Sequence, residues 1–162
     1  MNPRKVSDSL TIMTELVIPN DTNVLGNLRG GRLLHWMDVC SAISAGKHSN
    51  RVVVTASVDT VSFEHPIALG DVVTIKAQVT RAFTTSMEVY IEVWSEHLSN
   101  QDGQPNSGNK VKSNEAYYTF VALDDDGKPV KVPASETESE TEQKRFDGAL
   151  ERREMRLKFK NS

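Results

Sequence analysis

The residues with the clearest chemical potential lie at positions 19–38, where a polar loop leads into a helix through Gly30 and Gly31. The segment reads P-N-D-T-N-V-L-G-N-L-R-G-G-R-L-L-H-W-M-D. Backbone N–H groups at a helix start can bind an anion or polarise a carbonyl, and glycine lets a ligand approach the backbone closely. The glycine pair therefore indicates an oxyanion-binding helix start, although two glycines before a helix also occur as simple loop chemistry.

Asp38 lies about two helical turns beyond the glycines. On a helical wheel it shares a stripe of small or apolar residues with Leu34, Ala42 and Ala45. A carboxylate on an inward face needs a reason, and proton abstraction from water is one. We therefore predict a catalytic Asp38; a one-residue error in helix phase would make it a solvated side chain instead. Nearby, Asn23 and Asp21 are residue types that commonly shape turns and helix caps.

The elements that must position these residues follow from apolar periodicity. Residues 32–48 are predicted to form a helix, because apolar side chains recur there at three- and four-residue spacing: Leu33, Trp36, Met37, Cys40 and Ile43. A short strand at 11–18 precedes the loop. After the helix the period changes to two, which predicts strands at 51–64, 73–80, 87–94 and 115–123.

In the strand that begins at Arg51, one face is expected to carry Val52, Val54, Ala56 and Val58, and the other Thr55, Ser57 and Asp59. A loop at 99–114, rich in Ser, Asn, Gln, Gly and Pro, separates the last two strands, and a second helical segment is expected at 141–159.

Short links between the long strands favour antiparallel neighbours, so the sequence predicts an α+β domain with one helix on a five-stranded sheet. One helix on so wide a sheet leaves apolar surface uncovered, which predicts self-association. We divide the chain into a tail (1–9), the domain (10–134), and an acidic linker with a basic C-terminal helix (135–162).

Composition excludes several classes of protein. A chain of 162 residues is about one domain. The single cysteine points to a reducing compartment, and neither a signal peptide nor an apolar run of roughly 18 residues is present. A net charge of −3 argues against nucleic-acid binding, and the histidines lack metal-ligand spacing. We expect a cytoplasmic protein with no metal and neither nucleic acid nor membrane as partner.

The string at 19–38, followed by R-V-V-V-T-A-S-V-D at 51–59 and F-E-H-P-I at 63–67, resembles the hotdog-fold acyl-CoA thioesterases. The likeness is to the bacterial YciA type and the repeated domains of animal brain (cytosolic) acyl-CoA hydrolase, and it covers residues 11–123. The resemblance implies a long central helix wrapped by a five-stranded antiparallel sheet. It also implies hydrolysis of acyl-CoA to a free fatty acid and coenzyme A without a separate cofactor. The implied assembly is a dimer that builds a hexamer, a trimer of dimers.

The resemblance assigns roles residue by residue. Asp38 matches the active-site acid, a general base or nucleophile, and Asn23 matches the loop asparagine that orients the water or the thioester. The N–H of Gly31 matches the donor that polarises the thioester carbonyl, and Gly30 gives the ligand room. The resemblance further implies a site shared between subunits, with Asn23 of one chain facing Asp38 of the other.

Other assignments rest on position along the strands. Thr55 or Ser57 is the candidate for a strand hydroxyl that faces the site. Candidates for contacts with the phosphates of coenzyme A stand at strand ends: Arg51, Arg81, Thr85 and Ser86. Structural salt bridges are an equal alternative for either arginine.

Two other functions are alternatives. A hotdog dehydratase or hydratase usually uses a histidine base, and no histidine lies at 21–31. A non-catalytic acyl-CoA-binding regulatory module has no need of a buried carboxylate, so intact Asn23 and Asp38 argue against it. Turnover measured with a thiol-trapping reagent separates enzyme from binding module.

Overall fold

The computed structural model describes residues 1–59, 61–98 and 109–161. Two α-helices and seven strands follow one another along this part of the chain: β1 (Arg4–Lys5), β2 (Thr11–Leu16), α1 (Gly30–Ser49), β3 (Val52–Val58), β4 (Val72–Ala82), β5 (Ser86–Glu96), β6 (Val111–Leu123), β7 (Ser135–Glu136) and α2 (Glu140–Lys160). Short 3₁₀ turns at Val6–Ser9 and Pro19–Asp21 complete the elements. No helix in the described ranges is long and apolar enough to cross a membrane.

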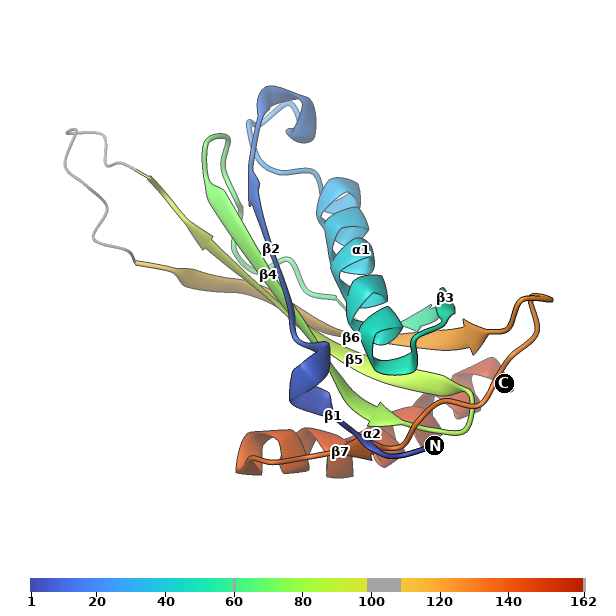
Figure 1. The fold of residues 1–162 in the computed structure, drawn as a ribbon. Helices are drawn as coiled ribbons and strands as arrows, with labels where there is room; N and C mark the ends of the chain where they lie inside the picture. Colours follow the sequence, from blue (N-terminus) through green and yellow to red (C-terminus); the bar gives the residue numbers. More distant parts are fainter. Residues whose placement is uncertain (60, 99–108, 162) are drawn as a thin grey trace.

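Five strands form one antiparallel sheet in the order β2-β4-β5-β6-β3. Helix α1 lies on one side of this sheet and α2 on the other (Figure 1). The predicted α+β, hotdog architecture is therefore confirmed. The strand β3, which follows α1 directly, forms one edge of the sheet.

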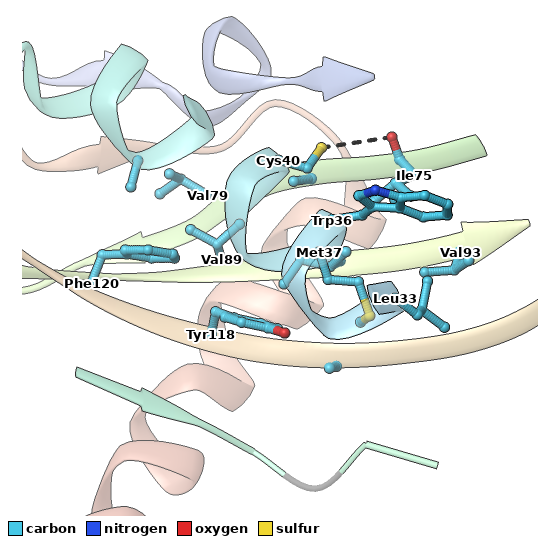
Figure 2. Packing of buried hydrophobic residues seen from close by; sticks show 14 of the residues in the cluster. Leu33, Trp36, Met37, Cys40, Ile75, Val79, Val89, Val93, Tyr118 and Phe120 are labelled. Atoms are coloured by element: carbon cyan, nitrogen blue, oxygen red, sulfur yellow. Dashed lines mark hydrogen bonds between the residues drawn. The ribbon is translucent and has the colours of Figure 1, made fainter. Parts of the chain in front are cut away.

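The core lies between α1 and the sheet. Helix residues Leu33, Met37 and Cys40 are at most 2% exposed, and they pack over buried strand side chains that include Val89 and Phe120 (Figure 2). The helix ends because Asn50 takes the left-handed conformation at φ 55°. This packing fixes which face of α1 points toward the sheet, and so it fixes where Asp38 points.

Two predicted strand limits were wrong. The strand after the helix ends at Val58 rather than at the His65-Pro66 break, and β6 begins at Val111, inside the predicted loop at 99–114. Residues 112–114 carry polar side chains typical of a loop, yet Ser113 and Asn114 are 2% and 5% exposed. Residues 99–108 of the predicted loop lie outside the described residues.

The C-terminal helix packs against the face of the sheet opposite α1. Arg152 of α2 holds Glu88 of β5 through two hydrogen bonds, Nε to Oε2 at 2.9 Å and Nη2 to Oε1 at 2.8 Å. Glu88 is fully buried, and it also accepts from Thr80 at 2.6 Å and from Arg156 at 3.3 Å. The second face of the sheet is therefore covered, which the sequence pattern did not predict.

The N-terminal segment also packs into the fold. Strand β1 pairs in parallel with β7, and Val6 and Ser9 are 1% and 0% exposed. The hydroxyl of Ser9 accepts a hydrogen bond from the backbone N–H of Val79 on β4 at 2.9 Å. Residues 4–9 thus contact both the core and the start of the C-terminal segment.

Candidate active site

The carboxylate of Asp38 is hydrogen-bonded to one hydroxyl group of the sheet. Thr55 on β3 donates a hydrogen bond from Oγ1 to Asp38 Oδ1 at 2.6 Å. Asp38 itself is half-buried. The buried Tyr118 on β6 lies nearby, and burial, followed by the negative charge of Asp38, raises the pKa of Tyr118 to about 12. One carboxylate oxygen is thus held by a fixed donor, and the described chain gives the other no hydrogen bond.

A β-bulge in β3 decides which strand hydroxyl faces Asp38. Thr55 is opposite the buried Phe120, but after an extra residue, Ala56, it is Ser57 that stands opposite Thr119. Directly opposed residues share a face of the sheet, so the bulge turns Thr55 toward α1 and Ser57 toward the α2 side. Of the two predicted candidates, the structure brings only Thr55 to Asp38. The expected strict alternation along 52–58 was wrong for this reason.

The start of α1 presents free backbone donors. No side chain caps it, and the N–H groups of Arg32 and Leu33 both reach the carbonyl of Arg29 at 3.1 Å. Among the described residues, the amides of Gly30 and Gly31 have no partner, as expected for the first turn of a helix. Apart from its two chain neighbours and the backbone of its own helix, no atom of the described chain lies within 4 Å of the place where a Cβ of Gly31 would stand. A ligand carbonyl can therefore approach the positive end of a 20-residue helix.

The side chain of Asn23 stabilises the loop in which it lies. Its Oδ1 accepts from the backbone N–H groups of Leu25 at 2.9 Å and Asn27 at 3.2 Å. Asp21, 7% exposed, ties that loop to α1 through an ion pair with Arg32 at 3.2 Å. Within the described chain no hydrogen bond joins Asn23 to Asp38. Asn23 thus lies in the loop that leads into the start of α1, whereas Asp38 is paired with Thr55.

Within the described chain, none of the candidates for coenzyme A contacts forms a hydrogen bond with Asp38. Arg81 donates to the carbonyl of Phe146 at 3.2 Å and its guanidinium stands 4.0 Å from the centre of that ring, so it fastens α2 to the sheet. Thr85 lies in the turn between β4 and β5, and Ser86 is the first residue of β5. Their carbonyls accept hydrogen bonds from the backbone N–H groups of Ala122 and Phe83, respectively. Arg51 is exposed and lines a cavity of about 600 Å³ beside the end of α1.

In the part of the chain that the structure describes, no three His, Cys, Asp or Glu side chains gather as metal ligands would. Tyr118 is the neighbour of Asp38 that the sequence pattern did not reveal, because strand alternation marks it only as a core residue.

Comparison with known proteins gives consistent matches. Residues 25–99 match the family model described as the thioesterase superfamily. The chain is 39% identical over 149 residues to YkhA of Bacillus subtilis, named an uncharacterized acyl-CoA thioester hydrolase, with 92% of this chain and 83% of that protein covered. A crystal structure of an apo-hexameric acyl-CoA thioesterase superposes with a TM-score of 0.88 at 39% identity, covering 98% of this chain and 97% of the other.

A third match, the acyl-CoA hydrolase of Staphylococcus aureus, was solved with butyryl coenzyme A, coenzyme A and coenzyme A disulfide. Its TM-score is 0.86 at 36% identity, covering 97% of this chain and 92% of that one. Three variants of that enzyme carry alanine in place of an asparagine, an aspartate and a threonine. Asn23, Asp38 and Thr55 follow one another here in the same order and with the same separations.

Sequence identity over most of both chains, together with the shared fold, carries the assignment. This chain belongs to the acyl-CoA thioesterases of the thioesterase superfamily.

Proposed function

We propose that the protein hydrolyses acyl-CoA with Asp38 as general base or nucleophile and the Gly31 N–H as the donor to the thioester carbonyl. The observation that carries this proposal is the hydrogen bond of 2.6 Å from Thr55 to Asp38, which orients one carboxylate oxygen and leaves the other for water or substrate. The matching separations in the S. aureus variants support the same three positions.

Either role gives a balanced reaction. As a base, Asp38 takes a proton from water while the water oxygen attacks the carbonyl carbon, and collapse of the tetrahedral intermediate expels the thiolate of coenzyme A. As a nucleophile, the carboxylate attacks the carbonyl itself, the thiolate leaves, and water then hydrolyses the mixed anhydride. In both, the helix-start N–H stabilises the oxyanion.

The two halves of this machinery are separated along one helix. Gly31 and Asp38 are seven residues apart on α1, about 10 Å along the helix axis. A base must lie within about 3 Å of the proton it removes, or be joined to it by one water. We therefore place Gly31 and Asn23 of one subunit opposite Asp38 and Thr55 of a second.

The exposed edge strand β3 supports such a dimer. Val52, Val54 and Val58 are 72%, 44% and 44% exposed there, and unpaired strand edges favour pairing with another chain. The hexameric relatives support three such dimers in one assembly. Acyl-CoA is then the substrate, with coenzyme A leaving as product.

The experiment replaces Asp38 by Ala and by Asn and follows release of coenzyme A with a thiol-trapping reagent. We expect kcat/KM to fall by about 10² or more, since general-base roles contribute roughly 10²–10⁴ in rate. Thr55→Val should lose less, and Thr55→Ser should recover most of that loss because it keeps the donor. Retention of more than about a tenth of wild-type kcat/KM by Asp38→Ala would refute the assignment. Tight binding of acyl-CoA without release of coenzyme A by the wild type would show a binding module instead.

A further inference from the structure

A buried carboxylate that the proposed reaction does not use closes the turn before β4. Asp71 is 3% exposed. Its Oδ2 accepts a hydrogen bond from the backbone N–H of Ala68 at 2.9 Å, and its own N–H donates to the carbonyl of Ala68 at 3.0 Å. Burying a carboxylate costs free energy, which hydrogen bonds to its oxygens offset. The reason for an aspartate here therefore lies in what the turn holds in place.

The turn at 68–71 is attached to the loop at 23–28. Ala68 and Asn27 face each other in an isolated antiparallel bridge. One backbone hydrogen bond on each side of the bridge joins the two segments: Leu28 to Ile67 at 2.6 Å, and Leu69 to Gly26 at 2.9 Å. The position of the loop therefore depends on the position of the turn.

Asn27 connects this bridge to Asn23, the loop residue of the candidate site. The backbone N–H of Asn27 donates to Asn23 Oδ1 at 3.2 Å, and the carbonyl of Asn27 accepts from the backbone N–H of Asn23 at 2.8 Å. An unbroken set of contacts thus runs from Asp71 through Ala68 and Asn27 to Asn23. A shift of the turn would move Asn27 and with it the Asn23 side chain.

The carboxylate of Asp71 is fixed from more than one side. Its Oδ1 is hydrogen-bonded to Nδ1 of His97, the residue that directly follows β5. Its backbone carbonyl accepts from the N–H of Val17 at 2.9 Å. Both carboxylate oxygens therefore have protein partners, and the residue is buried. This arrangement suits a group that positions other residues rather than one that touches the substrate.

We propose that Asp71 is a positioning residue for Asn23. The inference rests on the proposed function, in which Asn23 belongs to the site that binds and hydrolyses the thioester. A displacement of about 1 Å caused far from the chemistry can lower a rate about 100-fold. We therefore expect Asp71→Ala to lower kcat/KM about tenfold or more. Asp71→Asn should recover most of this loss, because its amide keeps an oxygen acceptor for the Ala68 N–H.

The experiment is a double-mutant cycle in the thiol-release assay, with Asp71→Ala, Asn23→Ala and the double variant. If Asp71 acts through Asn23, the double variant should be within about twofold of Asn23→Ala alone, because coupled residues do not show additive effects. Asp124→Ala is the matched control. Asp124 Oδ1 accepts from the backbone N–H groups of Asp126 and Lys128, both at 2.9 Å, in the turn after β6. Loss of that turn contact should leave kcat/KM unchanged.

Amide hydrogen exchange gives a readout besides activity. In Asp71→Ala the bridge amides of Leu28 and Leu69 should exchange about tenfold faster or more, because the turn that holds them opens locally. The amide of Cys40, inside α1, should keep its rate. Equal acceleration of all three amides would mean a general loss of stability and would overturn the positioning role.

The outcomes separate this inference from the function on which it rests. Additive losses in the cycle, or full activity of Asp71→Ala, refute the positioning role alone. Full activity of Asn23→Ala, or no hydrolysis by the wild type, refutes the function as proposed and the inference with it. If Asp71→Ala does not fold, Asp71→Ser takes its place in the cycle, because a serine hydroxyl is a weaker acceptor for the same turn.

Discussion

The two proposed catalytic groups, a side-chain carboxylate and a backbone amide, are positioned in different ways. Asp38 depends on one side-chain hydrogen bond, from Thr55, whereas the amide of Gly31 is positioned by the backbone of α1. A carboxylate is removed by substitution, but an amide can only be obstructed. Access to that amide is therefore the property to test at this position.

Replacement of Gly31 by Val should remove activity and leave stability nearly unchanged. The new side chain meets no atom of its own chain within 4 Å at Cβ, and valine is no worse than glycine in a helix. It does crowd the space where a carbonyl would bind, so we expect kcat/KM to fall at least about tenfold. Urea unfolding and the thiol-release assay measure the two effects.

The control is Gly46→Ala on the same helix, where the nearest atom to the new Cβ, the carbonyl oxygen of Arg51, is 3.9 Å away. It should keep full activity. Equal losses of activity and stability in Gly31→Val would mean that the glycine is needed only for packing, and full activity would exclude the amide from catalysis.

At the scale of the elements, the spacing of apolar residues predicted the helix and strands whose form depends on residues close together in the sequence. The helical spacing of Leu33, Met37 and Cys40 predicted α1, and strict alternation predicted β4 and β5. The motif around Asp38 predicted the central residues of the candidate site. These signals lie in short stretches of chain, so a single sequence carries them.

Features that depend on contacts distant in sequence were missed. Ser113 lies in a stretch typical of a loop, but it is buried because its hydroxyl pairs with that of Ser95 at 2.8 Å. The V-T-A-S-V sequence contains no signal for the bulge at Ala56. The sequence therefore did not predict that Thr55 and Ser57 lie on opposite faces of the sheet. Phe63 packs against Gly30, although α1 and β3 lie between the two residues in the sequence.

The packing of helix α2 was missed for a similar reason. Its basic half is typical of a solvated surface, but Arg152 reaches the fully buried Glu88 on the sheet. Breaking a buried ion pair costs about 3–5 kcal/mol when the remaining charge has no other partner, and Glu88 keeps the Thr80 hydroxyl and the longer contact with Arg156, so the low end of that range applies. We expect Arg152→Ala to lower the free energy of unfolding by about 3 kcal/mol in urea titrations.

The neighbouring Arg153 gives a matched control. It is exposed, makes no ion pair within the described chain, and stands 4.9 Å from the Phe83 ring. Arg153→Ala should cost less than about 1 kcal/mol. Equal effects of the two substitutions would mean that contacts other than the Glu88 pair hold α2 on the sheet.

At the scale of the whole molecule, the proposed site shared between subunits makes assembly part of the proposed chemistry. One chain holds Asn23 and Gly31 near one end of α1, and Asp38 with Thr55 about two turns further along. The exposed valines of β3 leave one edge of the sheet open beside Thr55. With the site shared as proposed, we expect a monomer to be folded and inactive.

Two inactive variants should then rescue each other. A mixed dimer of Asn23→Ala with Asp38→Ala has one site with both residues intact and one site with neither. Equal amounts that assemble at random give about half mixed dimers, so roughly a quarter of the wild-type activity should return. Co-expression with two different affinity tags, followed by sequential purification, isolates the mixed dimers, which should show about half of the wild-type rate in the thiol-release assay because one of their two sites is complete. Asn23→Ala with Gly31→Val is the matched control, because both residues belong to the same half and no mixed site is complete. Proven mixing without recovery would place Asn23 and Asp38 in one subunit's site and reject the shared arrangement, whereas recovery in the control pair would show that the two halves are divided differently.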